Sequence, residues 1–278
     1  MKDMSFIDRC RAFHRLHESG CFVIPNPWDI GSARVLAQLG FKALATTSSG
    51  FAWSRGLPDN HVSLEQALAH FRDIAASVDV PVNADFERGF ATEPADVARN
   101  VAEAVSTGVA GLSIEDSTGK SAEPLFAFEL SVERVAAARK SIDQSGTGVV
   151  LVARSEGFIA GRPDLTETIR RLAAYADAGA DCLYAPGIRS TADISAVVRA
   201  VAPKPVNVLV SSDFATVAEL AQLGVRRISV GGALARTAWA GFLQAATEIA
   251  ELGTFTGLGR AITGAELNGR FSEFGPSR

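Results

Sequence analysis

Acidic and amide side chains recur at the ends of short apolar runs in this chain. Asn83, Asp85 and Glu87 alternate through one such run and just beyond it, and Glu115 ends the next run along the chain. Alternate residues of an extended strand face the same side, so Asn83 and Asp85 would share a face. Oxygen ligands in this number suit a hard divalent cation, and Mg²⁺ usually keeps several of its waters. The spacing therefore predicts a magnesium site.

An arginine and a run of hydroxyl residues complete the polar candidates. Arg154 lies two residues before Glu156 in a later apolar run, and its planar guanidinium suits a substrate carboxylate. Another run leads into residues 46–50 (Thr-Thr-Ser-Ser-Gly), and a loop follows that reaches Asp59. Each candidate has a structural alternative, because the acids could cap helices, Arg154 could merely neutralise them, and Asn207 could be a satisfied core amide.

Eight short apolar runs alternate with longer amphipathic runs, and this alternation predicts the elements that position the polar residues. The apolar runs are mostly β-branched or small and too short for helices, so we predict strands. They cover residues 21–26, 42–48, 81–86, 111–116, 149–156, 182–186, 204–210 and 226–232. The predicted helices, several of which end at glycine, cover residues 63–78, 93–108, 131–146, 165–179, 191–201 and 216–224.

Strand–helix alternation with nearly continuous apolar strands predicts an α/β protein with a parallel sheet covered by helices. Eight units favour closure into a (β/α)₈ TIM barrel, with an open doubly wound sheet as the alternative. The length of 278 residues fits one barrel domain over 1–278, with strands within 21–232 and C-terminal helices and a tail over 233–278. The first of these helices is predicted over about 233–252. In such barrels the active site lies at the C-terminal ends of the strands, where the acids and Arg154 fall.

Composition excludes several classes of partner. The formal net charge is −4 and no run of Lys or Arg occurs, so we expect neither nucleic acid nor an anionic membrane as partner. No stretch reaches the ~18 apolar residues of a membrane span. The three cysteines, Cys10, Cys21 and Cys182, form no CxxC pair and predict no disulfide framework or structural zinc site. We therefore expect a cytoplasmic protein with a small-molecule substrate.

The positions of the histidines and lysines narrow the chemistry. None of the four histidines lies at a predicted strand end, which argues against a histidine zinc site, and no lysine lies inside the barrel for a Schiff base. Lys120 lies in the loop Ser117–Leu130, which is long enough to act as a lid; a solvated charge is the alternative. Gly231-Gly232 could form a phosphate cup or a tight turn.

Five segments, taken as an ordered set, resemble the isocitrate lyase / phosphoenolpyruvate mutase superfamily. The segments, which fall within about residues 18–245, are Leu57–Asp59, Val82–Glu87, Ser113–Ser117, Ala153–Glu156 and Pro205–Val208. The resemblance implies a barrel that depends on Mg²⁺, with Mn²⁺ as a possible substitute. It also implies a homo-oligomer, a tetramer or a dimer, in which the last helix is often exchanged between subunits.

The resemblance also implies roles for the candidate residues. The loop Ser48–Gly50 and Arg154 would hold substrate carboxylate oxygens, and Thr47 and Asn207 join them in the predicted substrate-binding set. The acids would organise the metal directly or through water, and the residues concerned are Asp59, Asp85, Glu87 and Glu115. The predicted catalytic residues are Arg154, Glu115 and Lys120.

Departures from the family pattern narrow the predicted function. Asn83 stands where the strand-three motif usually starts with Asp, and the loop Ser117–Leu130 lacks the cysteine acid of isocitrate and methylisocitrate lyases. Gly187 stands where those lyases have a glutamate, and Ala122 replaces the asparagine of the Lys-x-Asn pair of the mutases. The chain thus resembles the less specialised branch, which acts on oxaloacetate-like or other small 2-oxo acids.

The predicted reaction is Mg²⁺-dependent cleavage of a carbon–carbon bond in a small 2-oxo acid or diacid. Charge would flow onto the oxo oxygen as an enolate, which the metal and Arg154 stabilise more than the ground state. Decarboxylation and retro-aldol cleavage share this intermediate, and the sequence does not choose between them. The alternatives are a catalytically silent barrel that binds a 2-oxo acid, which Asn83 permits, a C–P bond enzyme acting on phosphonopyruvate, and a phosphate-ester enzyme using Gly231-Gly232.

Overall fold

The structure is a computed structural model, in which residues 4–274 are described. The chain forms two compact units that meet at the bond between Gly232 and Ala233. The prediction that residues 1–278 form a single domain stays a prediction. Each unit is described by itself below.

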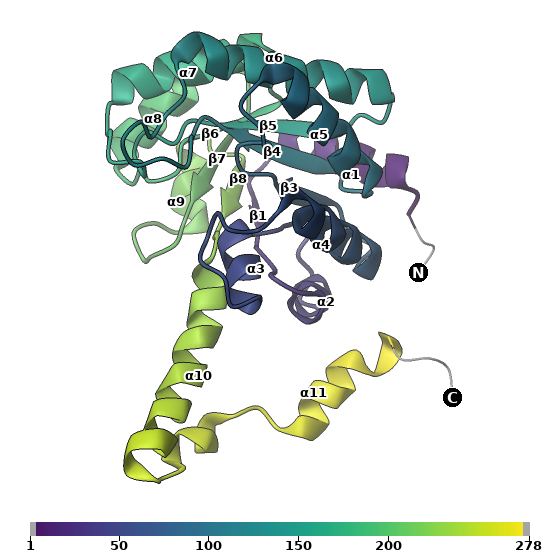
Figure 1. The fold of residues 1–278 in the computed structure, drawn as a ribbon, viewed down its shortest axis with the longest axis vertical. Helices are drawn as coiled ribbons and strands as arrows, with labels where there is room; N and C mark the ends of the chain where they lie inside the picture. The colour runs from purple at the N-terminus through teal and green to yellow at the C-terminus, as the bar shows by residue number, and fades with distance from the viewer. Residues whose placement is uncertain (1–3, 275–278) are drawn as a thin grey trace. The chain divides into compact units, whose positions relative to one another are not determined.

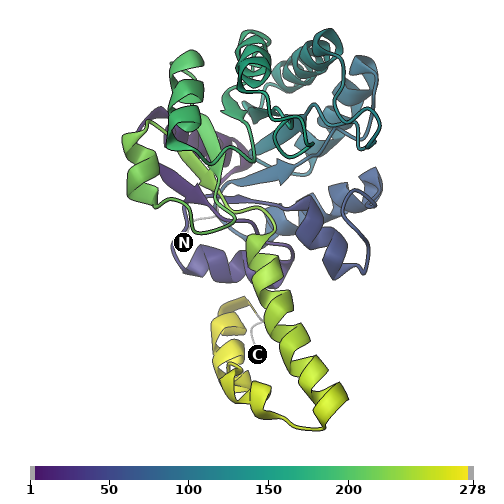
Figure 2. The same ribbon diagram turned by 90° about the vertical axis from the view of Figure 1, so that its left-hand side faces the viewer.

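The first unit is a nearly closed barrel of eight parallel strands, with the strands at the centre and helices around them (Figures 1 and 2). The strand order is β1-β8-β7-β6-β5-β4-β3-β2, and one backbone hydrogen bond, from Ala45 N–H to the Pro25 carbonyl at 3.0 Å, spans the opening between β1 and β2. The strands are β1 (Phe22–Ile24), β2 (Leu44–Ala45), β3 (Val82–Asp85), β4 (Gly111–Glu115), β5 (Val150–Arg154), β6 (Cys182–Tyr184), β7 (Val206–Leu209) and β8 (Arg227–Ser229). The predicted TIM barrel is confirmed.

Helices follow the strands and pack their apolar faces onto the outside of the sheet. Each predicted helix is present, although the one predicted over 131–146 begins earlier, at Phe128, and so shortens the predicted lid loop. The helices of this part are α2 (Ile30–Gln38), α4 (Leu64–Ser77), α5 (Pro94–Ser106), α6 (Phe128–Ser145), α7 (Leu165–Asp177), α8 (Thr191–Ala200) and α9 (Val217–Gln222). Alternate strand residues pack against these helices, which leaves the other half to line the barrel interior.

Helix α1 (Phe6–Glu18) precedes the barrel and covers its N-terminal end. The Phe13 side chain is fully buried, and a Cβ added to Gly111, at the start of β4, would lie 2.6 Å from the Phe13 ring. The ring therefore fills the floor of the barrel. No helix was predicted for this segment.

The second unit begins with α10 (Ala233–Leu252), whose bounds match the prediction. It continues through η1 (Thr256–Arg260), α11 (Gly264–Phe271) and η2 (Ser272–Phe274). The Glu248 carboxylate accepts hydrogen bonds from the backbone N–H groups of Thr256 and Gly257, which fastens the turn after α10. No helix within residues 4–274 is long and apolar enough to cross a membrane.

Candidate active site

A polar cavity of about 170 Å³ opens at the C-terminal ends of the strands. Residues from strands on all sides of the barrel line it, together with the segment that follows β2. They include Asn26, Thr46, Thr47, Ser48, Ser49, Asp59, Asn83, Asp85, Ser113, Arg154, Tyr184, Arg227 and Ser229. The C-terminal rim is where barrel enzymes carry their active sites, so this cavity is the candidate.

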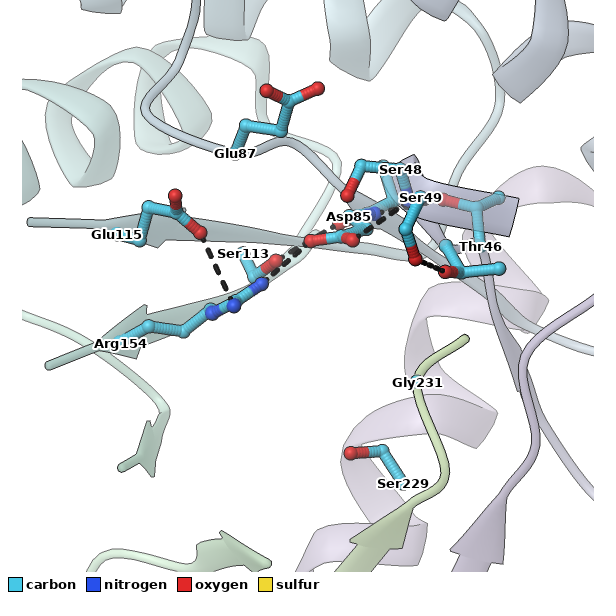
Figure 3. A network of polar contacts seen from close by, with 12 residues as sticks. Thr46, Ser48, Ser49, Asp85, Glu87, Ser113, Glu115, Arg154, Ser229 and Gly231 are labelled. Atoms are coloured by element: carbon cyan, nitrogen blue, oxygen red, sulfur yellow. Dashed lines mark hydrogen bonds and ion pairs between the residues drawn. The ribbon is translucent and has the colours of Figure 1, made fainter. Parts of the chain in front are cut away.

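The Arg154 guanidinium, at the end of β5, forms ion pairs with three carboxylates. Figure 3 shows two of them, Asp85 and Glu115. Its Nη1 lies 2.7 Å from Asp85 Oδ1, and its Nη2 lies 3.3 Å from Glu115 Oε2 and 2.8 Å from Glu156 Oε1. The Tyr184 ring faces the same guanidinium, with 5.0 Å between the guanidinium carbon and the ring centroid. Adjacency of β3, β4 and β5 in the sheet brings these charges together.

Asp85 is held by two segments as well as by Arg154. Its Oδ2 accepts a hydrogen bond from the Ser48 backbone N–H at 3.0 Å, and its own N–H donates to Thr46 Oγ1 at 2.9 Å. The predicted Ser48–Gly50 loop is instead the first turn of a short helix, α3 (Ser48–Ser54), and the loop assignment was wrong. Thr47 caps this helix by accepting from the Gly50 N–H, and a Thr-Ser-Ser start is the signal that could have revealed it.

Glu87 and Asp59 add negative charge beside Asp85. Glu87 is buried, and its φ of 48° is a left-handed conformation that residues other than glycine seldom adopt. Burial, with the charges of Asp85 and Asp59, raises the pKa of Glu87 to about 7. Burial and the charge of Asp85 also raise the pKa of Asp59. The three acids repel one another, and a cation between them would relieve that repulsion.

The donor set fits a partly hydrated Mg²⁺. Within residues 4–274, no group of three or more acidic, histidine or cysteine side chains is arranged as direct ligands of one ion. Mg²⁺ keeps several waters and is usually bound through one or two carboxylates, so Asp85, Asp59 and Glu87 suit a site in which waters bridge part of the shell. Glu115 is less suited to bind the metal than these three acids. Burial raises the pKa of its carboxyl well above the usual range, even beside Arg154, and so favours the protonated form.

Glu87 and Glu115 are not among the residues that line the cavity, and three further predicted residues also lie away from it. Lys120 is exposed in the loop after β4, which an antiparallel bridge between Ser117 and Leu125 folds into a hairpin. Asn207 is buried and donates to Ser229 Oγ at 3.0 Å, the contact of a core amide, although its own Oδ1 has no partner. Gly50 is buried in α3. Substrate roles for these three residues stay predictions.

Asp116 and the Gly231-Gly232 segment have structural roles. Asp116 accepts from Tyr175 Oη at 2.8 Å and pairs with Arg171 at 3.1 Å. The Gly231 N–H, which a phosphate cup would need, already donates to Asn26 Oδ1 at 2.8 Å. The Gly231-Gly232 segment is therefore a tight turn in this arrangement.

Sequence reasoning missed Tyr184 and Arg227 in the barrel interior. Both follow the alternation of their strands, which is the signal that could have found them. Burial raises the pKa of Tyr184 to about 12, so its hydroxyl stays neutral. Arg227 is 3% exposed, and its Nη1 lies 3.3 Å from Asn83 Oδ1. Asn83, the residue that departs from the family motif, is thus the hydrogen-bond partner of a buried arginine.

The chain belongs to the phosphoenolpyruvate phosphomutase family, whose model matches residues 13–250. The predicted superfamily is confirmed. An uncharacterized protein of Mycobacterium tuberculosis is 35% identical over 265 residues, which cover 95% of this chain and 97% of that protein. A Burkholderia cenocepacia J2315 protein, provisionally described as a lyase/mutase, has a crystal structure with a TM-score of 0.93 and 48% identity, covering 96% of this chain and 97% of that one.

More distant relatives have named activities on small acids. Oxaloacetate acetylhydrolase in complex with its product oxalate has a TM-score of 0.85 at 29% identity, with coverage of 95% and 94% of the two chains. Phosphonopyruvate hydrolase in complex with oxalate and Mg²⁺ has a TM-score of 0.83 at 25% identity, covering 96% and 95%. Oxaloacetate decarboxylase of Bradyrhizobium diazoefficiens is 30% identical, covering 65% of this chain and 64% of that protein.

Proposed function

We propose that this protein is a Mg²⁺-dependent lyase that cleaves a carbon–carbon bond in a short 2-oxo diacid such as oxaloacetate. The cavity carries the proposal, because it combines Asp85 and Asp59 with Arg154 at the C-terminal rim of a barrel of this family. Its volume of about 170 Å³ lies below the 300–1,000 Å³ of pockets for drug-sized ligands and suits a substrate of a few carbons. A small-acid substrate also agrees with the named activities of the relatives.

In this mechanism the chain's residues bind the substrate head and receive its developing charge. Asp85, Asp59 and Glu87, with Glu115 at a greater remove, would hold the metal directly or through water. When bound, Mg²⁺ supplies Lewis-acid polarisation of the oxo and carboxylate oxygens of the substrate. Arg154 faces the charge that develops as the bond breaks, and it stabilises an enolate more than the neutral ketone. The hydroxyls of Ser48 and Ser49 line the same cavity and would orient the carboxylate.

Position 187 supports the preference for short substrates. Gly187 has a φ of +94°, and a Cβ there would lie 3.0 Å from Phe158 Cβ. A glutamate, which the resemblance places here in the tricarboxylate lyases, would be strained in this backbone. We therefore expect isocitrate and methylisocitrate to remain uncleaved. The lid role of Lys120 also stays a prediction, because Lys120 would reach the cavity only if the hairpin loop moved.

The decisive experiment is a screen of 2-oxo acids and diacids with Mg²⁺, with detection of pyruvate, glyoxylate, oxalate and CO₂. We expect oxaloacetate or a similar diacid to turn over, EDTA to abolish the reaction, and added Mg²⁺ or Mn²⁺ to restore it. Pyruvate with CO₂ would indicate decarboxylation, whereas oxalate would indicate hydrolysis. Binding of these acids without any turnover would instead support the catalytically silent barrel, and efficient isocitrate cleavage would contradict the proposal.

The second unit motivates a proposal about assembly. It exposes many large apolar side chains, including Trp239, Phe242, Leu243, Leu252 and Phe255. Exposed apolar groups in this number are typical of surfaces that other chains cover. We propose a cytoplasmic homo-oligomer, a tetramer or a dimer, in which α10 is exchanged between subunits. Light scattering of the full chain would test it, and a monomer at micromolar concentration would contradict it.

A further inference from the structure

Arg227 is a buried cation that lacks a counterion. Its side chain lies inside the barrel between the Phe13 ring on the floor, 5.8 Å from the guanidinium carbon to the ring centroid, and the polar cavity that it helps to line. Its hydrogen bond to Asn83 Oδ1, at 3.3 Å, is long, and its Nε has no partner. Within residues 4–274 it makes no ion pair, in contrast to Arg154, which makes three.

The groups around Arg227 cannot supply the missing negative charge. Burial raises the pKa of the Cys182 thiol to about 11 and that of the Tyr184 hydroxyl to about 12, so both stay neutral. The charge of Asp85 acts on Arg227 only from a distance, and both Asp85 oxygens already accept from Arg154 and Ser48. Arginine stays protonated in proteins, so Arg227 keeps its unpaired positive charge in the ligand-free protein.

A buried, unpaired guanidinium is costly, and an anion that reaches it through the cavity would remove that cost. The cavity joins the two ends of the site, since Asp85 and Arg154 line it at the rim and Arg227 lines it deeper in the barrel. Ser113 and Ser229 also line the cavity, and the Ser229 hydroxyl, which accepts from Asn207, can donate to a ligand. A carboxylate is the group that the planar fork of an arginine matches best.

We propose that Arg227, with Asn83 beside it, binds the second carboxylate of the substrate and so selects diacids over monoacids. This inference rests on the proposed function, since it assumes that a 2-oxo head occupies the rim. Asn83 matters because an amide, unlike an aspartate, leaves the charge of Arg227 available to the substrate. Arg227 thereby becomes a specificity-determining residue, while the chemistry stays at the rim.

The test compares a ligand that carries only the head with one that carries both ends. Oxalate mimics the head, and 3,3-difluorooxaloacetate, an inhibitor of oxaloacetate acetylhydrolase, carries both carboxylates. With saturating Mg²⁺, we expect Arg227→Met to weaken binding of the diacid about tenfold to a hundredfold, as for the loss of a charged hydrogen bond, and to leave oxalate within about twofold. Calorimetry measures both affinities.

Three further variants keep the result interpretable. Arg226→Met is the matched control, since Arg226 directly precedes β8, donates to the Gly20 carbonyl and does not line the cavity; it should change neither affinity. Arg227→Lys keeps the positive charge but lacks the planar guanidinium, and it should recover part of the diacid affinity. Asn83→Asp leaves Arg227 in place but pairs it internally, and should lower the ratio of diacid to oxalate affinity.

Two outcomes would overturn the inference. One is an equal loss of oxalate and diacid affinity in Arg227→Met, which would mean that Arg227 acts on the whole site or holds a resident anion. The other is an unchanged diacid affinity. Failure of the proposed function looks different, because the wild-type protein with Mg²⁺ would then bind neither ligand, or would bind them but turn over no 2-oxo diacid.

Discussion

The barrel interior holds two arginines in opposite electrostatic situations. Arg154, at the rim, is shared by three carboxylates, whereas Arg227, deeper in the barrel, contacts one amide oxygen. The first group has more acid than its single cation neutralises, and the second has a cation that nothing neutralises. The contrast indicates a site with excess negative charge at the rim and excess positive charge deeper in the barrel. A diacid bound together with Mg²⁺ would balance both.

The largest effect is expected at the rim, from Asp85→Ala. Asp85 is the acid closest to Arg154 and the one held by the Ser48 N–H, so we expect its loss to lower Mg²⁺-dependent turnover about a thousandfold or more. The fold should survive, because Arg154 keeps Glu115 and Glu156 as partners. Calorimetry with Mg²⁺ and circular dichroism check the two parts, and undiminished Mg²⁺ affinity would disprove the metal assignment.

The two arginines should also respond oppositely when each is replaced by methionine. Arg154→Met leaves the buried Glu115 and Glu156 and the partly buried Asp85 without their cation, and we expect it to lower the free energy of unfolding by about 3–5 kcal/mol. Arg227→Met removes a cation that has no counterion, and we expect unchanged or higher stability in the ligand-free protein. Urea unfolding of both variants beside the wild type measures this difference. Equal destabilisation would show that the two sites do not differ in the way the structure indicates.

A smaller effect is expected from His70. Unlike the two arginines, this buried side chain avoids a positive charge by staying neutral in the folded protein. His70 is buried and stacked on Phe51, with 3.9 Å between ring centroids, and burial lowers its pKa to about 4. The unfolded chain takes up a proton on this residue near pH 6.5, while the folded protein does not until about pH 4. Stability should therefore fall as the pH drops through this window, by about 1.4 kcal/mol per pH unit where the slope is steepest.

The variant His70→Phe preserves the stacked ring and removes the titration. We expect its stability to fall less steeply than that of the wild type between pH 6.5 and pH 4, as measured by urea unfolding at several pH values. Part of the slope should remain, because burial also lowers the pKa of His17, to about 3. Identical slopes in the two proteins would mean that His70 is protonated in the folded state.

Much of the barrel could be predicted from local pattern. Each observed strand lies within its predicted run, and α10 has its predicted bounds, because periods of two and 3.6 residues are written directly into the order of apolar side chains. The rule that barrel chemistry lies at the C-terminal rim then selected Asp85, Glu87 and Arg154 without coordinates. Helix α3 was missed because serine and glycine are typical of loops, and only Thr47 indicated a cap.

The sequence by itself determined the elements and the chemical types at the rim, since both depend on neighbours along the chain. The pairing of charges was decided by the tertiary structure alone. Strand register places Glu115 beside Arg154, and barrel closure brings Arg227 of the last strand within hydrogen-bonding distance of Asn83 from the third. These partners lie up to 144 residues apart. Whether a buried charge is neutralised depends on the few ångströms between such groups, and no local pattern encodes that distance.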